Sequence, residues 1–91
     1  MKSRIQDDKN VCARCGCHCE HPDKHHIFNG LAYRDKSEED GLFVHMHHQC
    51  HMLTHSDPTA MRKWKEKGQL KYEAQIGTRE EFMERYGKSY L

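Results

Sequence analysis

The sequence has no long apolar run, no secretory leader, no repeat and no low-complexity segment. The first two absences predict a cytoplasmic protein without a membrane partner. Hydrophobic residues are also scarce, at 35% of the 91 positions against 32% for charged residues. A domain of this size and composition has a small core, so we expect a disulfide or a bound metal to stabilise it.

Neither sign of charge is in excess, because 15 Lys and Arg residues against 14 Asp and Glu residues leave a formal net charge of +1. A protein that held DNA through non-specific attraction alone would be more basic. If nucleic acid is the partner, the positive charge must be local or come from bound cations.

Metal-binding side chains, in contrast, are abundant. Five cysteines, an odd number, accompany nine histidines, which favours metal over a disulfide framework. Cys12 and Cys15 flank a turn followed by Gly16, a pattern that resembles a zinc knuckle. With His47 and Cys50 they would form a closed Cys₃His structural zinc site, which folds the chain and does no chemistry. The competing ligands are His45, His48, Cys17 and Cys19.

A second set of histidines could form a different kind of site. His51 and His55 are four residues apart, so on a helix they face the same way and can bind one cation. His25 and His26 are adjacent on a predicted strand, so their side chains point to opposite faces or to different parts of one cleft. One of them can complete a three-histidine metal site. The other stays free as a general base, because the pKa of a free imidazole is about 6.5.

The predicted fold is a small α+β domain in which a zinc-stapled β-hairpin is followed by a helix. The segment 25–28, bounded by Pro22 and by Asn29-Gly30, and the apolar run 42–44 predict the two strands, and the polar stretch 31–40 between them is expected to be irregular. The helix would begin near His47 or His48. Residues 1–10 are expected to form a frayed polar lead-in.

Residues 57–91 are predicted to form a helical extension of the same domain, which spans 1–91 with its knuckle and hairpin–helix core in 11–56. Ser56-Asp57-Pro58 would end one helix and cap the next, and Gly77 would end that one. Residues Thr78 to Glu81 are predicted to form a capping box at the start of a last helix, and Gly87 is predicted to end that helix. The aromatic residues and methionines here are assigned to the core, among them Trp64, Phe82, Met83 and Tyr86.

The order of these motifs resembles the HNH, or His-Me finger, nucleases, whose core is a β-hairpin and a helix around a metal (ββα-metal). The resemblance runs from Cys12 to Leu91, and the segments HHIFNG, SEEDGLFV and EEFMERYGKSYL are similar to small phage and prophage proteins of HNH type. It implies that His25 binds the metal and that His26 is the general base, as in the colicin-type branch. His51 stands where the family has its central asparagine, so it either binds the metal or orients the base.

The resemblance implies a metal-dependent DNA endonuclease or nickase that hydrolyses phosphodiester bonds in phage DNA metabolism, in the host cytoplasm. Its cofactors would be a structural Zn²⁺ and a second divalent ion (Mg²⁺, Mn²⁺, Ni²⁺ or Zn²⁺) on His25, His51 and His55. A chain this small that cuts both strands would act as a homodimer. The candidate nucleic-acid contacts are the basic residues Arg34, Lys36, Lys63 and Lys65.

Two other functions remain open. The chain could be an inactive zinc-stapled module that binds DNA or a phage or host protein. It could also be a histidine-rich metal-handling protein. That function would explain the unassigned histidines and cysteines, but not the ordered helices downstream. A second, open metal site distinguishes the nuclease from the module, because the module needs only the closed zinc site.

Overall fold

Two short antiparallel strands lie at the centre of the structure, a computed structural model that describes residues 2–91. Strand β1 (Asp23–His26) pairs with β2 (Phe43–Met46), so that His25 lies opposite Val44. The strands are displaced by one or two residues from the predicted ranges 25–28 and 42–44. Ile27 and its neighbour Phe28 are buried in the core beyond the end of β1.

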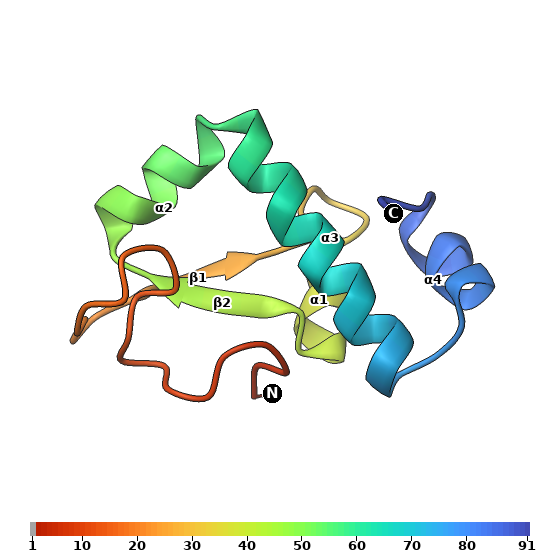
Figure 1. Ribbon diagram of the computed structural model, residues 1–91, viewed down its shortest axis with the longest axis horizontal. Coiled ribbons are helices and arrows are strands. Elements are labelled where there is room, and N and C mark those ends of the chain that lie inside the picture. The colour runs from red at the N-terminus through yellow and green to blue at the C-terminus, as the bar shows by residue number, and fades with distance from the viewer. Residues whose placement is uncertain (1) are drawn as a thin grey trace.

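Three helices follow the hairpin in the chain. Helix α2 (His48–His55) contacts both strands, and α3 (Pro58–Gln75) and α4 (Arg79–Tyr86) complete the chain (Figure 1). The chain is therefore a small α+β protein in which an antiparallel hairpin is followed by helices. Within residues 2–91, no helix combines the length and the apolar character that crossing a bilayer requires.

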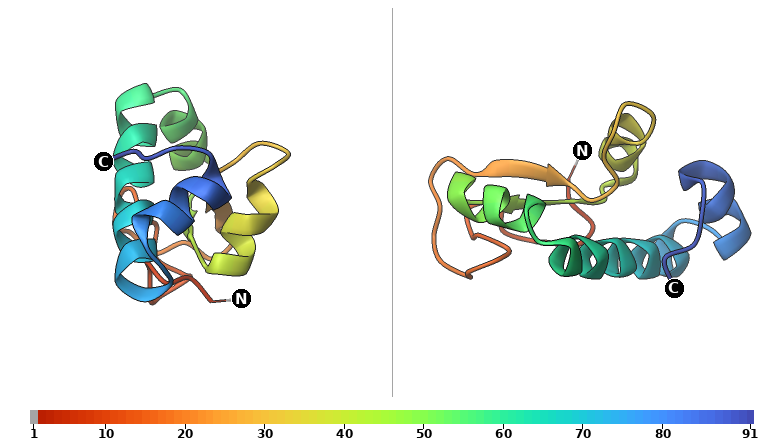
Figure 2. Two further views of the ribbon diagram at one scale, coloured as in Figure 1. Left: turned by 90° about the vertical axis from the view of Figure 1, so that its right-hand side faces the viewer. Right: turned by 90° about the horizontal axis from the view of Figure 1, so that it is seen from above.

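The connection between the strands contains a helix, so the prediction that 31–40 is irregular was wrong. Helix α1 (Arg34–Asp40) ends at Gly41, whose φ of 69° provides a left-handed cap. Ser37 is the buried residue of this helix, and its hydroxyl donates to the carbonyl of Phe28 at 2.8 Å and accepts from its N–H at 3.1 Å. Figure 2 shows α1 and α3 on opposite sides of the hairpin.

The segment before the knuckle is packed, so the prediction of a frayed lead-in at 1–10 was wrong from Ser3 onward. The N–H of Arg4 donates to the carbonyl of Gly41 at 2.8 Å, and Ile5 packs against the hydrophobic core. The packing of Ile5 and these polar contacts together hold the segment against β2 and the end of α1. Met1, the first residue of the predicted lead-in, lies outside the described residues.

The predicted helix boundaries in the second half are confirmed. The Asp57 carboxylate accepts from the N–H groups of Thr59 and Ala60, with Pro58 as the first helical residue of α3. Thr78 and Glu81 form a reciprocal capping box at the start of α4, and Gly87 caps its end at a φ of 91°.

The larger of the two core clusters is mostly aromatic, and α3 and α4 close it over the end of β1. The ring of Phe28 lies 5.2 Å from that of Phe82 and 4.6 Å from that of Tyr86. Gly68 of α3 packs so closely that a Cβ there would meet Ile27 at 2.9 Å. The core assignment was wrong for Met83, which is 42% exposed. It lies next to Phe82 in α4, and consecutive helical positions do not share a face.

Candidate metal centres

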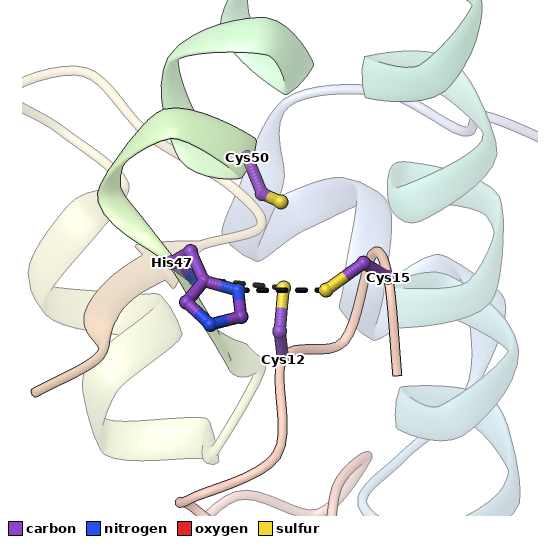
Figure 3. Close-up of side chains that lie close together, drawn as sticks. All are labelled: Cys12, Cys15, His47 and Cys50. Atoms are coloured by element: carbon purple, nitrogen blue, oxygen red, sulfur yellow. Dashed lines mark hydrogen bonds between the residues drawn. The ribbon is translucent and has the colours of Figure 1, made fainter. Parts of the chain in front are cut away.

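Three cysteines and a histidine form a cluster beside the start of α2. Cys12 and Cys15 belong to the loop before β1, His47 caps α2, and Cys50 lies in its first turn (Figure 3). Their ligand atoms all lie within 4.8 Å of one another, so this cluster could hold a metal ion. The structure thus brings together the four residues that the sequence predicted for one site. The competing candidates His45, His48, Cys17 and Cys19 lie outside this group.

The backbone of the knuckle places its two thiols on one side of a tight turn. The N–H of Gly16 donates to the carbonyl of Cys12 at 2.8 Å, and the φ of Gly16 is 78°, which a residue with a Cβ rarely adopts. The N–H of Cys12 in turn donates to the carbonyl of Cys17 at 2.8 Å. A bridge between Val11 and His18 closes the loop behind them.

Local N–H groups favour thiolates in this cluster, and the thiolate is the form that binds metals. Burial raises the pKa of the Cys12 thiol. The backbone N–H groups of Cys15, His47 and Arg14 outweigh burial and bring that pKa down to about 6. The pKa of Cys15 is also lowered, chiefly by the N–H of Cys17. Burial raises the pKa of Cys50, so its thiol is the hardest of the three to ionise without a metal.

The hydrogen bonds of His47 define which of its nitrogens faces the thiols. Its Nε2 lies 3.0 Å from the carbonyl oxygen of His18. A carbonyl only accepts, so Nε2 carries the hydrogen and Nδ1 holds the lone pair. That Nδ1 lies 3.4 Å from Sγ of Cys15. A carbonyl that fixes the ring of a ligating histidine in this way is typical of metal sites.

A second cluster joins β1 to the far end of α2. It consists of His25, His51 and His55, whose ligand nitrogens also lie within 4.8 Å of one another. The Nε2 atoms of His51 and His55 are 3.0 Å apart, and the ring of His25 lies 5.2 Å from each of their rings. The three histidines predicted to form one site therefore converge in the structure.

His25 is the unusual member of this cluster. It is 1% exposed, and neither of its ring nitrogens has a hydrogen-bond partner in the described part of the chain. Its pKa is lowered to about 4, first by burial and then by the charges of the neighbouring His51 and His55. His25 is consequently neutral at pH 7, which is the form that binds a cation. A metal would satisfy a nitrogen that is otherwise buried without a partner.

Asp23 orients His51, and the sequence analysis missed this role. Its Oδ2 accepts from Nδ1 of His51 at 3.0 Å and from Nδ1 of the exposed His48 at 2.7 Å. Nε2 of His51 therefore carries the lone pair, on the side of His55. The sequence held a usable signal, because Asp23 precedes His25 by two residues and shares its face of the strand.

His26 points away from His25, as their adjacent positions on a strand predicted. Its Nε2 lies 2.9 Å from Oε1 of Glu38 in α1. It nevertheless lines the same pocket as His51 and His55, a hollow of about 660 Å³. The pocket also includes the 29–31 loop and the charged side chains of Lys24, Arg34 and Asp35.

The four predicted nucleic-acid contacts lie in different surroundings. Arg34 lines the pocket. Lys36 does not, because its ammonium donates to the carbonyl of Arg85 at 3.0 Å. On α3, Lys65 lies over the ring of Tyr90 and Lys63 is exposed, and neither lines the pocket.

No protein-family model, no curated protein and no solved structure matches this chain. Function is therefore inferred from the geometry of the two clusters and of the pocket between β1, α1 and α2.

Proposed function

We propose that the protein is a metal-dependent DNA endonuclease or nickase of HNH type, stapled by a structural zinc. The observation that carries this proposal is the position of His25. Its two buried nitrogens have no partner among residues 2–91, and it lies against the convergent nitrogens of His51 and His55. Both of those histidines open onto the pocket that His26 also lines. The proposed metal ligands His51 and His55 thus share one cavity with the imidazole of His26.

Zinc is the metal that best suits the cysteine cluster. Three thiolates and one imidazole match its preference for sulfur and nitrogen ligands in a four-coordinate site. Four protein ligands leave no open position, so this ion would stabilise the fold. It would tie the loop that holds Cys12 and Cys15 to the start of α2.

The histidine cluster would hold the catalytic ion. Three imidazoles leave coordination positions open, and imidazole ligands suit transition metals such as Zn²⁺ and Ni²⁺. When bound, such an ion neutralises charge on a phosphate and stabilises the leaving oxygen. Neutral His25 and the oriented Nε2 of His51 are both in the form that ligation needs.

The remaining side chains of the pocket have separate roles in this proposal. His26 accepts a proton from the attacking water as the general base. Arg34, at the start of α1, binds a phosphate oxygen of the substrate. Because the net charge is only +1, a polyanion would be held mainly through this local group and the bound cation.

The test combines metal analysis with a cleavage assay. Metal content per chain would be measured for wild type, for the double variant His25→Ala, His55→Ala, and for His21→Ala, which changes an exposed histidine outside both clusters. Each protein would then be tested for nicking of supercoiled plasmid with added Mg²⁺, Mn²⁺, Ni²⁺ or Zn²⁺. We expect one tightly held zinc in all three, and cutting by wild type and His21→Ala only.

Two results would contradict the proposal. If the double variant cuts as well as wild type, the histidine cluster is not the catalytic site. If zinc is bound but no added metal produces cutting, the chain is a non-catalytic module, and its partner is DNA or another protein.

A further inference from the structure

Helix α1 brings a carboxylate to His26. The helix is fixed against the chain that follows β1, because the buried hydroxyl of Ser37 bonds both the N–H and the carbonyl of Phe28. Glu38, the next residue, places Oε1 at 2.9 Å from Nε2 of His26. Twelve residues separate the two in the sequence, so this contact exists because the inter-strand segment is helical.

Glu38 is held as a carboxylate by two partners. The hydrogen bond from His26 contributes most to lowering the pKa of Glu38, and the hydrogen bond and charge of Lys24 lower that pKa as well. The Lys24 ammonium donates to both oxygens, at 3.0 and 3.2 Å, and also lies 4.2 Å from the centre of the Phe43 ring. Lys24 therefore has a fixed position from which to hold Glu38 in place.

The charge of Glu38 determines the tautomer of His26. A carboxylate only accepts hydrogen bonds, so Nε2 of a neutral His26 carries the hydrogen and Nδ1 carries the lone pair. No residue in 2–91 bonds that Nδ1, and it is not among the buried polar atoms that lack a partner, so solvent reaches it. His26 thus presents a free lone pair from a side chain that lines the pocket.

We infer that Glu38 is the positioning residue of the general base, an inference that rests on the proposed nuclease function. It holds His26 with Nε2–H bonded and Nδ1 available. As the water oxygen forms its bond to phosphorus, a water proton passes to Nδ1. The ester P–O bond then breaks, and the leaving oxygen keeps the electron pair and takes a proton from solvent. Glu38 stabilises the resulting imidazolium and does not take the proton itself.

A purely structural role for Glu38 would have a different signature. Glu38 and Lys24 are both partly exposed, at 37% of each side chain, and ion pairs of this kind contribute little to stability. The neighbouring Glu39 provides a matched control. It lies on the same helix, is more exposed, and bonds Arg85 at 2.9 Å instead of His26.

The experiment compares wild type, Glu38→Gln, Glu38→Asp and Glu39→Gln. Nicking would be followed under saturating and limiting DNA, which separates kcat from KM. The ring nitrogens of His26 would be observed by ¹⁵N NMR on the zinc-loaded protein, which reports the tautomer without any cleavage. Thermal unfolding would show that each variant is folded.

We expect Glu38→Gln to lower kcat about 10- to 100-fold with little change in KM, by analogy with residues that orient metal-binding histidines. The NMR signals of His26 should change from the Nε2–H tautomer to a mixture. Glu38→Asp should recover part of the rate, and Glu39→Gln should match wild type in both measurements.

Three other outcomes would contradict the inference. If Glu38→Gln leaves both kcat and the tautomer unchanged, Glu38 does not position the base. If the tautomer changes and kcat does not, His26 is not the base that Glu38 serves, and the inference is overturned. If wild type does not cut at all, the proposed function has failed together with this inference, and the NMR result then describes only a structural hydrogen bond.

Discussion

The Nε2 atoms of His51 and His55 lie 3.0 Å apart, on successive turns of α2. The carboxylate of Asp23 accepts a hydrogen bond from Nδ1–H of His51, so the Nε2 of that ring carries a lone pair. Without a cation, His55 must supply the hydrogen between the two nitrogens. With a cation, both can turn lone pairs toward it, and Asp23 is then the group that keeps one of them in place.

Asp23→Asn should therefore weaken metal binding at the histidine cluster. An amide can donate as well as accept, so it no longer fixes the tautomer of His51, and we expect the affinity to fall about 10- to 100-fold. Calorimetric titration of the zinc-loaded protein with Ni²⁺ measures this change. The control is His48→Ala, which removes the other partner of Asp23 and leaves its bond to His51. Equal affinity in Asp23→Asn and wild type would contradict the role of Asp23.

Replacing Cys15 should have a much larger effect than replacing Cys17, two residues away. Cys15 belongs to the four-ligand cluster, whereas the exposed Cys17 does not. Structural zinc contributes an apparent free energy of about 10–16 kcal/mol, comparable with the whole stability of a small domain. We expect Cys15→Ser to lose zinc and to melt far below wild type, and Cys17→Ser to retain both properties. Elemental analysis and circular dichroism test this, and full zinc content in Cys15→Ser would refute it.

His25→Leu should stabilise the protein when the histidine cluster holds no metal. The change removes two buried nitrogens that lack partners in the described chain, for a gain of about 1–3 kcal/mol at pH 7. Urea unfolding of the zinc-loaded proteins measures it.

The gain from His25→Leu should also grow in acid. The pKa of His25 is about 4 in the folded state and near 6.5 in the unfolded state, so the unfolded chain binds the extra proton between these values. Wild type should therefore lose about 3 kcal/mol relative to the variant as the pH falls from 6.5 to 4. Taking the difference between the two proteins cancels the acid sensitivity of the cysteine cluster that they share. A difference that does not vary with pH would count against a buried neutral His25.

Arg34 and Lys36 should differ in their effect on DNA binding, although the sequence treats them alike. Arg34 lines the pocket, whereas Lys36 bonds the carbonyl of Arg85. Arg34→Ala should raise KM and reduce the salt-dependence slope of binding by about 0.9, the value for one lost phosphate contact on duplex DNA. Lys36→Ala should leave both unchanged. Equal slopes for the two variants would show that Arg34 does not contact phosphate.

The sequence was most informative where side-chain chemistry and spacing coincide. His51 and His55, four residues apart, converge because a helix places such residues on one face. Asp57 before Pro58, and Thr78 before Glu81, predicted their caps because these signals are local. The grouping of Cys12 and Cys15 with His47 and Cys50 followed from the ligand preferences of zinc.

Several of the contacts that the sequence did not predict depend on α1. The segment from Arg34 to Asp40 is polar, and its buried member is Ser37, so it has no apolar face from which a helix could be predicted. Without that helix, nothing links Glu38 to His26, and Lys36 cannot be distinguished from Arg34. Ile5 was missed for a similar reason, because one apolar residue in a polar stretch has no periodicity.

The sharing of α2 by the two clusters constrains which substitutions the helix tolerates. Cys50 belongs to one cluster and His51, the next residue, to the other. Thr54 is buried and donates to the carbonyl of Cys50 at 2.8 Å, and His48 bonds Asp23. Only three of its positions, Gln49, Met52 and Leu53, are both exposed and free of these contacts. In a saturation mutagenesis experiment selected for folding and metal content, sequence diversity in α2 should be concentrated at these three sites.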